Sequence, residues 1–405
     1  MNRYIILLTV AIATLNSCKE NKKETRILAS KEVQVDQQAG ECPYLTKDSR
    51  GNTVLSWVRI INDSTTAFCY AVSKDGKSFG SPVVIPNSNN IQPHGENLPK
   101  IIFKPSGEII ALWGAGNPNP RNKYSGLVFY VQSFDEGKTW NKPRPLITDT
   151  SSFDQRYYDV ALLPNGEAGI LWLDNRKTNK KDGSGLYFAT TKGRNGFQDD
   201  RMISQSCCQC CRTDLFIDSK GNIHALYRAI LDNSIRDMVH IVSTDGGNSF
   251  SNPQRISNDN WMINGCPHTG PAMTENKDGI HFAWFTGGEN GGCYYTKSTD
   301  NGKTFSDRDS VSSLGSHPQL APVSNGELII VWDEAHVVDN KPFKKIGIQR
   351  RSADGKTKGK EYITADDSIA SYPVVTALNE KSSVIAYTKT DGNKSYVAYK
   401  VVSLK

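Results

Sequence analysis

Short apolar segments recur along the chain roughly every 55 residues between Trp57 and Tyr387. Each segment, such as EIIALWG, NIHALYR or ELIIVWD, is rich in β-branched and aromatic residues and lacks helical spacing. The pattern predicts a strand, a glycine turn and a second strand that is buried on both faces. In five copies the glycine stands six residues before the aromatic residue, at Gly51/Trp57, Gly107/Trp113, Gly166/Trp172, Gly221/Tyr227 and Gly326/Trp332.

Two imperfect copies, Gly279/Trp284 and Lys381/Tyr387, bring the number of repeats to seven. Four strands fit in a repeat of this length, which is the size of a β-propeller blade. The sequence therefore predicts an all-β propeller of seven four-stranded blades, with six blades and one appended unit as the alternative. We expect Ile27–Val35 to supply the outer strand of the last blade and to close the ring. The other strands of that blade are expected near Tyr372–Leu378, Ser383–Lys389 and Tyr396–Ser403.

A second motif lies between the repeated apolar segments. Its complete copies are SFDEGKTW at 133–140, STDGGNSF at 243–250 and STDNGKTF at 298–305. We expect a hairpin turn in which the aspartate accepts backbone N–H bonds, the glycine takes a positive φ and the aromatic residue packs inward. The residues expected in these roles are Asp135, Gly137, Trp140, Asp245, Gly247, Phe250, Asp300, Gly302 and Phe305.

This motif resembles the Asp box, or BNR repeat, of the sialidase superfamily. The resemblance covers nearly the whole chain after its N-terminal segment. It implies a propeller in which these turns are structural and lie on the face away from the active site. The middle of the chain, from LWLDNRK through CCQCCRTD and NGCPHTGPA to HFAWFTGG, is also similar to bacterial exported sialidase-like propellers that carry a CCxCC segment. That similarity implies a fold and leaves the reaction open.

The composition narrows the class of protein. The 48 Lys and Arg residues slightly outnumber the 42 Asp and Glu residues, and no run of five like charges occurs. The net charge of +6 therefore forms no basic stripe, and we expect no nucleic-acid partner. With 37% hydrophobic and 9% aromatic residues, the chain has an ordinary globular composition, which excludes disordered, collagen-like and coiled-coil classes.

The N-terminus has the features of a bacterial lipoprotein signal. The apolar stretch Tyr4–Leu15 is too short to span a bilayer, and the sequence LNSC follows, which resembles a lipobox ending at Cys18. We therefore expect export, with a lipid on Cys18 anchoring the protein to a membrane that faces the periplasm or the cell surface. The expected segments are a signal peptide at 1–17, a polar tether at 18–25 and a single propeller domain at 26–405.

Loops on the face opposite the aspartate turns concentrate charged, thiol and imidazole side chains, and loops on a rigid scaffold often carry function. The sialidase resemblance implies arginines that hold a substrate carboxylate, an acid/base aspartate and a glutamate that assists a tyrosine nucleophile. Glu41 stands where the first arginine of that family belongs, which disfavours sialic acid as the substrate. The candidates for the catalytic roles are Arg156, Arg176, Arg228, Asp159 and Glu289.

Two functions remain open from the sequence. The first is the binding or cleavage of a small glycan at the channel mouth, with exo-glycosidase chemistry of the sialidase type that requires no cofactor. The alternative is a non-catalytic propeller that binds another small ligand or handles a metal on the same face.

The segment CCQCC is the most unusual stretch of the chain. Its four thiols, with a cysteine and a histidine of the following blade, offer soft ligands for zinc or copper. The other interpretation, favoured by an oxidising compartment, is that disulfides join the segment to the next blade through Cys266. The residues concerned in both interpretations are Cys207, Cys208, Cys210, Cys211, Cys266 and His268.

Overall fold

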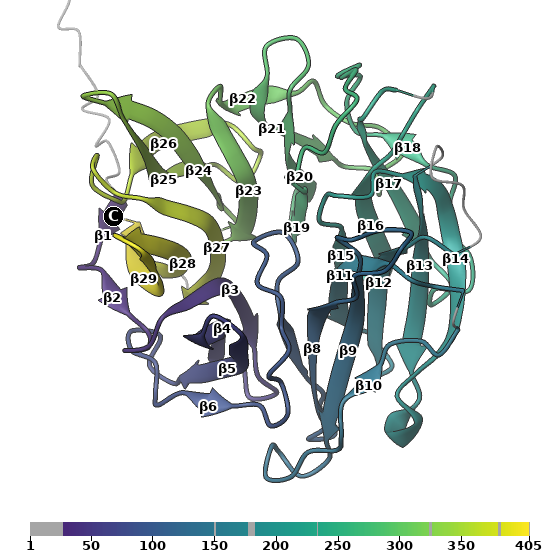
Figure 1. Cartoon of the computed structure of the whole chain (residues 1–405). Coiled ribbons are helices and arrows are strands. Elements are labelled where there is room, and N and C mark those ends of the chain that lie inside the picture. Colours follow the sequence, from purple (N-terminus) through teal and green to yellow (C-terminus); the bar gives the residue numbers. More distant parts are fainter. Residues whose placement is uncertain are drawn as a thin grey trace, which may run out of the picture.

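A computed structural model describes residues 27–149, 151–176, 183–232, 234–323, 326–379 and 382–404. Within these ranges the strands form seven antiparallel sheets (Figure 1). The first strand of each sheet contacts the first strand of the next, and the seventh contacts the first, so the sheets close into a ring. The predicted seven-bladed, all-β propeller is confirmed, and the six-bladed alternative is wrong. The predicted signal peptide, Cys18 and the tether lie outside the described residues.

Blades one to three follow one another along the chain, each from its innermost to its outermost strand. Their strands are β3 (Gly40–Lys47), β4 (Thr53–Asn62), β5 (Thr65–Ser73) and β6 (Val83–Val84); β7 (Lys100–Phe103), β8 (Ile109–Gly116), β9 (Gly126–Ser133) and β10 (Arg144–Pro145); and β11 (Gln155–Leu162), β12 (Ala168–Asp174), β13 (Ser184–Thr191) and β14 (Phe197–Cys207). The 3-10 turn η2 (Gly193–Asn195) lies between β13 and β14.

Blades four to six repeat this order. Their strands are β15 (Asp214–Ile217), β16 (Ile223–Arg228), β17 (Met238–Ser243) and β18 (Gln254–Arg255); β19 (Ala272–Asn276), β20 (Gly279–Thr286), β21 (Gly292–Ser298) and β22 (Asp309–Ser312); and β23 (Gly315–Pro322), β24 (Leu328–Val338), β25 (Lys341–Arg351) and β26 (Thr357–Tyr362).

Blade seven joins the two ends of the described chain. It contains β27 (Ala370–Asn379), β28 (Ser382–Asp391) and β29 (Lys394–Leu404), with the N-terminal strands β1 (Ile27–Ala29) and β2 (Val33–Gln34) paired to β29. Ile27 is opposite Leu404, and Val33 is opposite Tyr399. The predicted closure of the ring by the N-terminal segment is therefore confirmed.

The second strand of each blade forms the core. Its repeated aromatic residue is at most 1% exposed in every blade, which accounts for the regular spacing of these residues in the sequence. The glycines that precede them lie in the left-handed region, with φ between +81° and +85° at five turns, where a side chain is disfavoured. The seven aromatic residues are Trp57, Trp113, Trp172, Tyr227, Trp284, Trp332 and Tyr387.

The aspartate turns join the third and fourth strands of blades two, four and five. Asp135 accepts the N–H of Thr139 at 2.8 Å, and Asp245 and Asp300 accept equivalent bonds at 2.9 Å. In each turn a serine donates to the same carboxylate, and the glycine has a φ between +82° and +89°. These turns lie on one face of the ring, because the loops before the first strand and after the second strand leave from the other face, the channel mouth.

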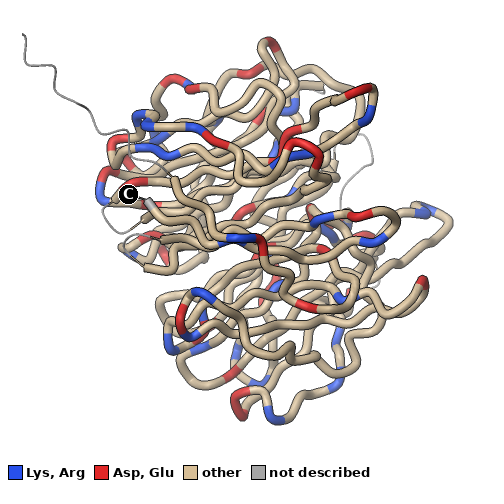
Figure 2. Tube along the Cα trace, turned by 90° about the vertical axis from the view of Figure 1, so that its left-hand side faces the viewer, with Lys and Arg blue, Asp and Glu red and all other residues tan. Residues whose placement is uncertain are grey.

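Charged residues of both signs are interspersed over the side of the ring that Figure 2 presents. Within the described residues there is no helix long and apolar enough to cross a membrane.

Candidate functional site

The loop His94–Asn97, between β6 and β7, runs through the middle of the ring at the channel mouth (Figure 1). Buried Glu96 forms a 2.7 Å ion pair with Arg212, which lies between β14 and β15. The second carboxylate oxygen of Glu96 accepts the N–H of Gly270 at 2.5 Å. Arg212 also donates to the carbonyl of Pro318 in blade six. One buried ion pair therefore links blades two, four, five and six.

Gly95 fixes the same loop against blade seven. A Cβ atom added at Gly95 would lie 2.6 Å from carbon atoms of the Tyr372 ring, so no larger residue fits without displacing that ring. The Tyr372 ring packs on His317, with 4.2 Å between the ring centroids. The Nδ1 atom of His317 lies 2.7 Å from a carboxylate oxygen of Asp333. The central loop is therefore held by an aromatic contact on one side and an ion pair on the other.

Five residues at the mouth have a strained backbone. Each stands at or just before the first strand of its blade and has a φ between +49° and +59° without being glycine. In four of them the strand pairing shifts register at this point, as it does at a β-bulge. Such strain is common where a fold aims side chains at a functional site. The residues are Cys42, Tyr157, His268, His317 and Tyr372.

A cavity of about 490 Å³ opens beside the central loop. Its wall includes His94 and Asn97 from that loop and Arg156 and Tyr157 from the start of blade three. The remaining wall residues are polar, aromatic, small or thiol-bearing, and come from blades two, four and five. They are Gln92, Gly114, Ala115, Asn122, Tyr124, Gly126, Gln209, Cys210, Cys266 and His268.

The protonation of His94 is set by its surroundings. Burial, assisted by the nearby His268, Arg156 and His317, lowers the pKa of His94 to about 4. Its Nδ1 accepts the backbone N–H of Glu96 at 3.1 Å, which places the proton of the neutral ring on Nε2. At neutral pH His94 is therefore an uncharged hydrogen-bond donor.

Arg156 brings a guanidinium, ion-paired with Asp154, to the wall of this cavity. Its Nη2 donates to Asp154 at 2.6 Å, and its guanidinium lies 5.5 Å from the Tyr157 ring centroid. Because a guanidinium has five N–H donors, this single contact leaves others for a ligand. Burial raises the pKa of Tyr157, so its hydroxyl stays protonated.

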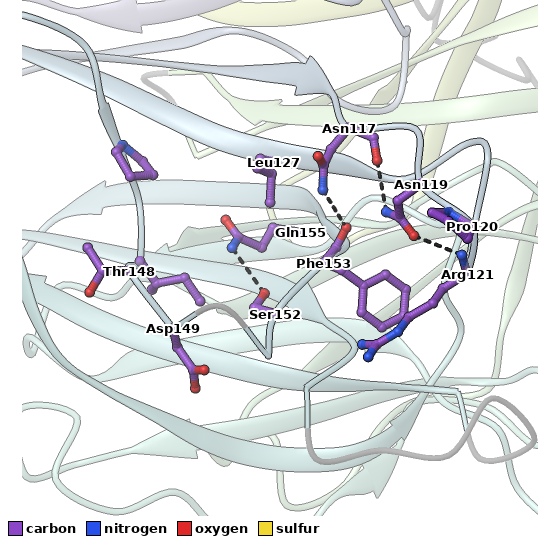
Figure 3. A pocket seen from close by; sticks show the side chains of 12 residues that line it. Asn117, Asn119, Pro120, Arg121, Leu127, Thr148, Asp149, Ser152, Phe153 and Gln155 are labelled. Carbon is purple, nitrogen blue, oxygen red and sulfur yellow. Dashed lines mark hydrogen bonds between the residues drawn. The ribbon is translucent and has the colours of Figure 1, made fainter.

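A second cavity of about 670 Å³ is lined by residues of blades two and three (Figure 3). The hairpin at 117–125, between β8 and β9, contributes to both, with Asn119 and Arg121 in the second cavity and Asn122 and Tyr124 in the first. Arg121 lies 4.9 Å from the Phe153 ring centroid. Figure 3 shows Asn119, Arg121 and Phe153 gathered at one end of the second cavity.

Of the five predicted catalytic residues, Arg156 alone lines the cavity beside the central loop. Arg176 is buried among carboxylates, with Asp200 at 2.5 Å and Asp174 at 3.3 Å, and its guanidinium stacks 4.1 Å from the Tyr187 ring centroid. Its charge is compensated within blade three.

The remaining three predicted catalytic residues have separate environments. Asp159 is buried, with its carboxylate 2.5 Å from Lys100, and also accepts the N–H of Leu215. Arg228 is buried and donates mainly to backbone carbonyls. Glu289 is exposed, at the turn between β20 and β21. The five residues therefore do not line one cavity, and their predicted catalytic roles stay predictions.

Three thiols of the CCQCC segment gather in one place. The sulfur atoms of Cys208, Cys210 and Cys211 all lie within 4.8 Å of one another, and those of Cys208 and Cys210 are 3.6 Å apart. Cys207, the last residue of β14, is not in this group, and its thiol approaches the carbonyl of Gln205 at 3.6 Å.

No disulfide is present among the described residues, where all eight cysteines are free thiols. Cys266 is exposed while the four thiols of CCQCC are buried, and the predicted bridge between them stays a prediction. His268 lines the cavity together with Cys210 and Cys266. The predicted neighbourhood of these residues is observed, but the predicted covalent bond is not.

Some residues of the site were not predicted. Tyr124, with 68% of its surface exposed, and Asn122 line the cavity from the hairpin at 117–125. The unusual length of this connection, rich in Asn, Pro and Gly, was the one available signal. The pairing of Glu96 with Arg212 had no signal, because the two residues lie in different blades.

No protein-family model and no curated protein matches the chain. Solved structures show a similar fold. A protein of unknown function from Dyadobacter fermentans has a TM-score of 0.53 and 13% identity, over 94% of this chain and 99% of that one. The polysaccharide lyase Uly1 has a TM-score of 0.54 and 10% identity, over 92% and 91%. A mutant of NanB sialidase from Streptococcus pneumoniae has a TM-score of 0.50 and 11% identity, over 90% and 86%. At these identities the chain shares a sialidase-like propeller fold with them.

Proposed function

We propose that the cavity beside the central loop binds an acidic saccharide. The main support for this proposal is the composition of the cavity wall. Arg156, the amides of Asn97 and Asn122, and the neutral N–H donor of His94 all line the same cavity. An arginine pairs with a carboxylate or sulfate through charge-assisted hydrogen bonds. Amides and a neutral imidazole suit sugar hydroxyls, and the exposed ring of Tyr124 offers a face on which a sugar can stack.

The proposal is for saccharide binding rather than sialidase-type hydrolysis. Three arginines would have to converge for that reaction, and Arg176 and Arg228 are held by buried partners away from the cavity wall. The chain shares its fold with a polysaccharide lyase and a sialidase, which supports a glycan as the ligand. The second cavity, which is lined in part by the same hairpin, is a separate candidate site for a further sugar unit.

We also propose that the protein acts outside the cytoplasm, attached to a membrane by lipid on Cys18. This rests on the LNSC sequence and the polar residues that follow it. The glycan would then be met at the periplasmic or outer cell surface.

Calorimetric titration with uronic acids, sialic acid and matched neutral sugars tests the binding proposal. We expect an acidic sugar to bind and Arg156→Ala to weaken its binding by about 10- to 100-fold, because a hydrogen bond to a charged group contributes about 1.5 to 3 kcal/mol. Arg50→Ala is the matched control, since Arg50 is exposed and lies in the turn between β3 and β4, on the opposite face.

Equal binding of neutral sugars, or unchanged affinity in Arg156→Ala, would contradict the proposal. Incubating the same preparation with a panel of polysaccharides and measuring released reducing ends and unsaturated uronates separates cleavage from binding alone.

A further inference from the structure

The thiol group in the loop between β14 and β15 has a geometry that the proposed saccharide site does not use. Cys208, Cys210 and Cys211 supply three sulfur atoms within 4.8 Å of one another, and the closest pair is 3.6 Å apart. A disulfide requires about 2.05 Å. Two thiolates on one tetrahedral zinc ion, each at 2.3 Å, are about 3.8 Å apart. The closest pair therefore has the spacing of two ligands on a common ion, and the third sulfur lies within 4.8 Å of both.

The environment of these sulfurs is apolar. The three residues are at most 3% exposed and pack in the hydrophobic core between blades three and four, against residues such as Leu186 and Ala229. Soft thiolate ligands in such a setting favour d¹⁰ ions such as Zn²⁺ and Cu⁺ over oxygen-binding cations.

Arg228 is an independent indication of negative charge at the sulfurs. Its guanidinium is buried and donates to Cys211 Sγ at 3.3 Å and to three backbone carbonyls. Its guanidinium also lies 5.0 Å from the Trp261 ring centroid, but within the described ranges no carboxylate forms an ion pair with it. A buried arginine is permanently charged and costly without an anionic partner. The sulfur cluster is the group that can supply this anion.

We propose that Cys208, Cys210 and Cys211 bind a thiophilic d¹⁰ metal ion, with Arg228 as the charge-compensating residue. Charge favours Zn²⁺, because three thiolates and one Zn²⁺ leave a single negative charge that the guanidinium balances. Cys210 also lines the saccharide cavity, so the ion is accessible from there. Cys266 and His268 line the same cavity and offer a sulfur or nitrogen atom for a fourth ligand.

The test is metal analysis of the full chain purified under reducing conditions without chelator. We expect about one equivalent of zinc per chain, which Cys210→Ser and Cys211→Ser each abolish. Cys69→Ser is the matched control, because Cys69 is equally buried but stands alone within β5. If copper is found in place of zinc and is lost in the same cysteine variants, the metal site is supported, but the argument that charge selects Zn²⁺ is wrong.

A second measurement avoids reliance on variants that fail to fold. Reduced wild-type apoprotein is titrated with Zn²⁺ in competition with a chromophoric chelator. Arg228→Met is expected to weaken the affinity for Zn²⁺ by about 10- to 100-fold, because it removes a residue that hydrogen-bonds to a metal ligand. No binding by the folded, reduced apoprotein would overturn the proposal, as would the absence of label on any of Cys208, Cys210 and Cys211 in denatured, non-reduced protein. Saccharide binding is measured on the apoprotein, so either proposal can fail without the other.

Discussion

Replacing Glu96 by Gln tests whether the buried ion pair holds the central loop. The substitution keeps the shape of the side chain but leaves the Arg212 guanidinium, only 4% exposed, without its carboxylate. Removing one partner of a buried pair destabilises a protein by about 3 to 5 kcal/mol. At the usual unfolding entropy per residue, a chain of this length loses roughly 1 °C of Tm per kcal/mol, so we expect a fall of roughly 3 to 6 °C.

The same substitution is expected to weaken saccharide binding, because His94 and Asn97 are positioned by the loop that Glu96 anchors. The assays are thermal and urea unfolding, both followed by tryptophan fluorescence, and calorimetric titration of the folded variant.

Glu136→Gln is the control for the charge change. Glu136 pairs with Arg50 at 3.0 Å, but both side chains are more than half exposed, so the loss is expected to stay below about 1 kcal/mol. A Glu96→Gln protein as stable as this control would show that the pair does not hold the loop, and the reasoning would fail.

Three further predictions address the turns, the pH dependence and the anchor. Gly247→Ala is expected to destabilise the protein by about 1 to 3 kcal/mol more than Gly246→Ala in urea unfolding. Both glycines have a positive φ, but a Cβ at Gly247 would lie 2.6 Å from an aromatic ring of the neighbouring blade, whereas Gly246 faces open space. Equal losses of stability in the two variants would refute this. Burial lowers the pKa of His240 to about 3 and of His281 to about 4, so both rings stay neutral in the folded state. In the unfolded chain they are protonated below about pH 6.5, so Tm is expected to decline as the pH falls from about 6.5 to 4. A Tm that does not change over this pH range would contradict the prediction. Cys18→Ser is expected to release the protein from the membrane fraction, as measured by fractionation after a high-salt wash, and retention would exclude the lipid anchor.

The fold could be predicted from the sequence because each blade repeats the same local requirements. A glycine at a positive φ, as at Gly107, and an aromatic residue in a doubly buried strand, as at Trp113, are needed at the same positions of most blades. Such local requirements leave a periodic trace. Ring closure was predictable for a related reason, since the last repeat lacked an outer strand.

The site was predictable only in part, because its geometry depends on partners from other blades. Arg176 and Arg228 stand at comparable positions of blades three and four, yet one is ion-paired with carboxylates and the other donates to carbonyls and a sulfur atom. Asp159 was expected to be an acid but faces Lys100 from the neighbouring blade. Spacing along one chain segment does not record such contacts.

The pairing of β1 with β29 also has a kinetic consequence. Because Ile27 and Leu404 are neighbours in one sheet, the ring cannot close until almost the whole chain has been synthesised and, if it is exported, translocated. This contact joins residues that are very far apart in sequence, and such contacts form slowly because a long loop must close first. Blade seven is therefore expected to be the last blade to assemble and the first to open. Removing the residues of β1 and β2 would leave β29 as an unpaired outer edge of blade seven, prone to pairing with other chains.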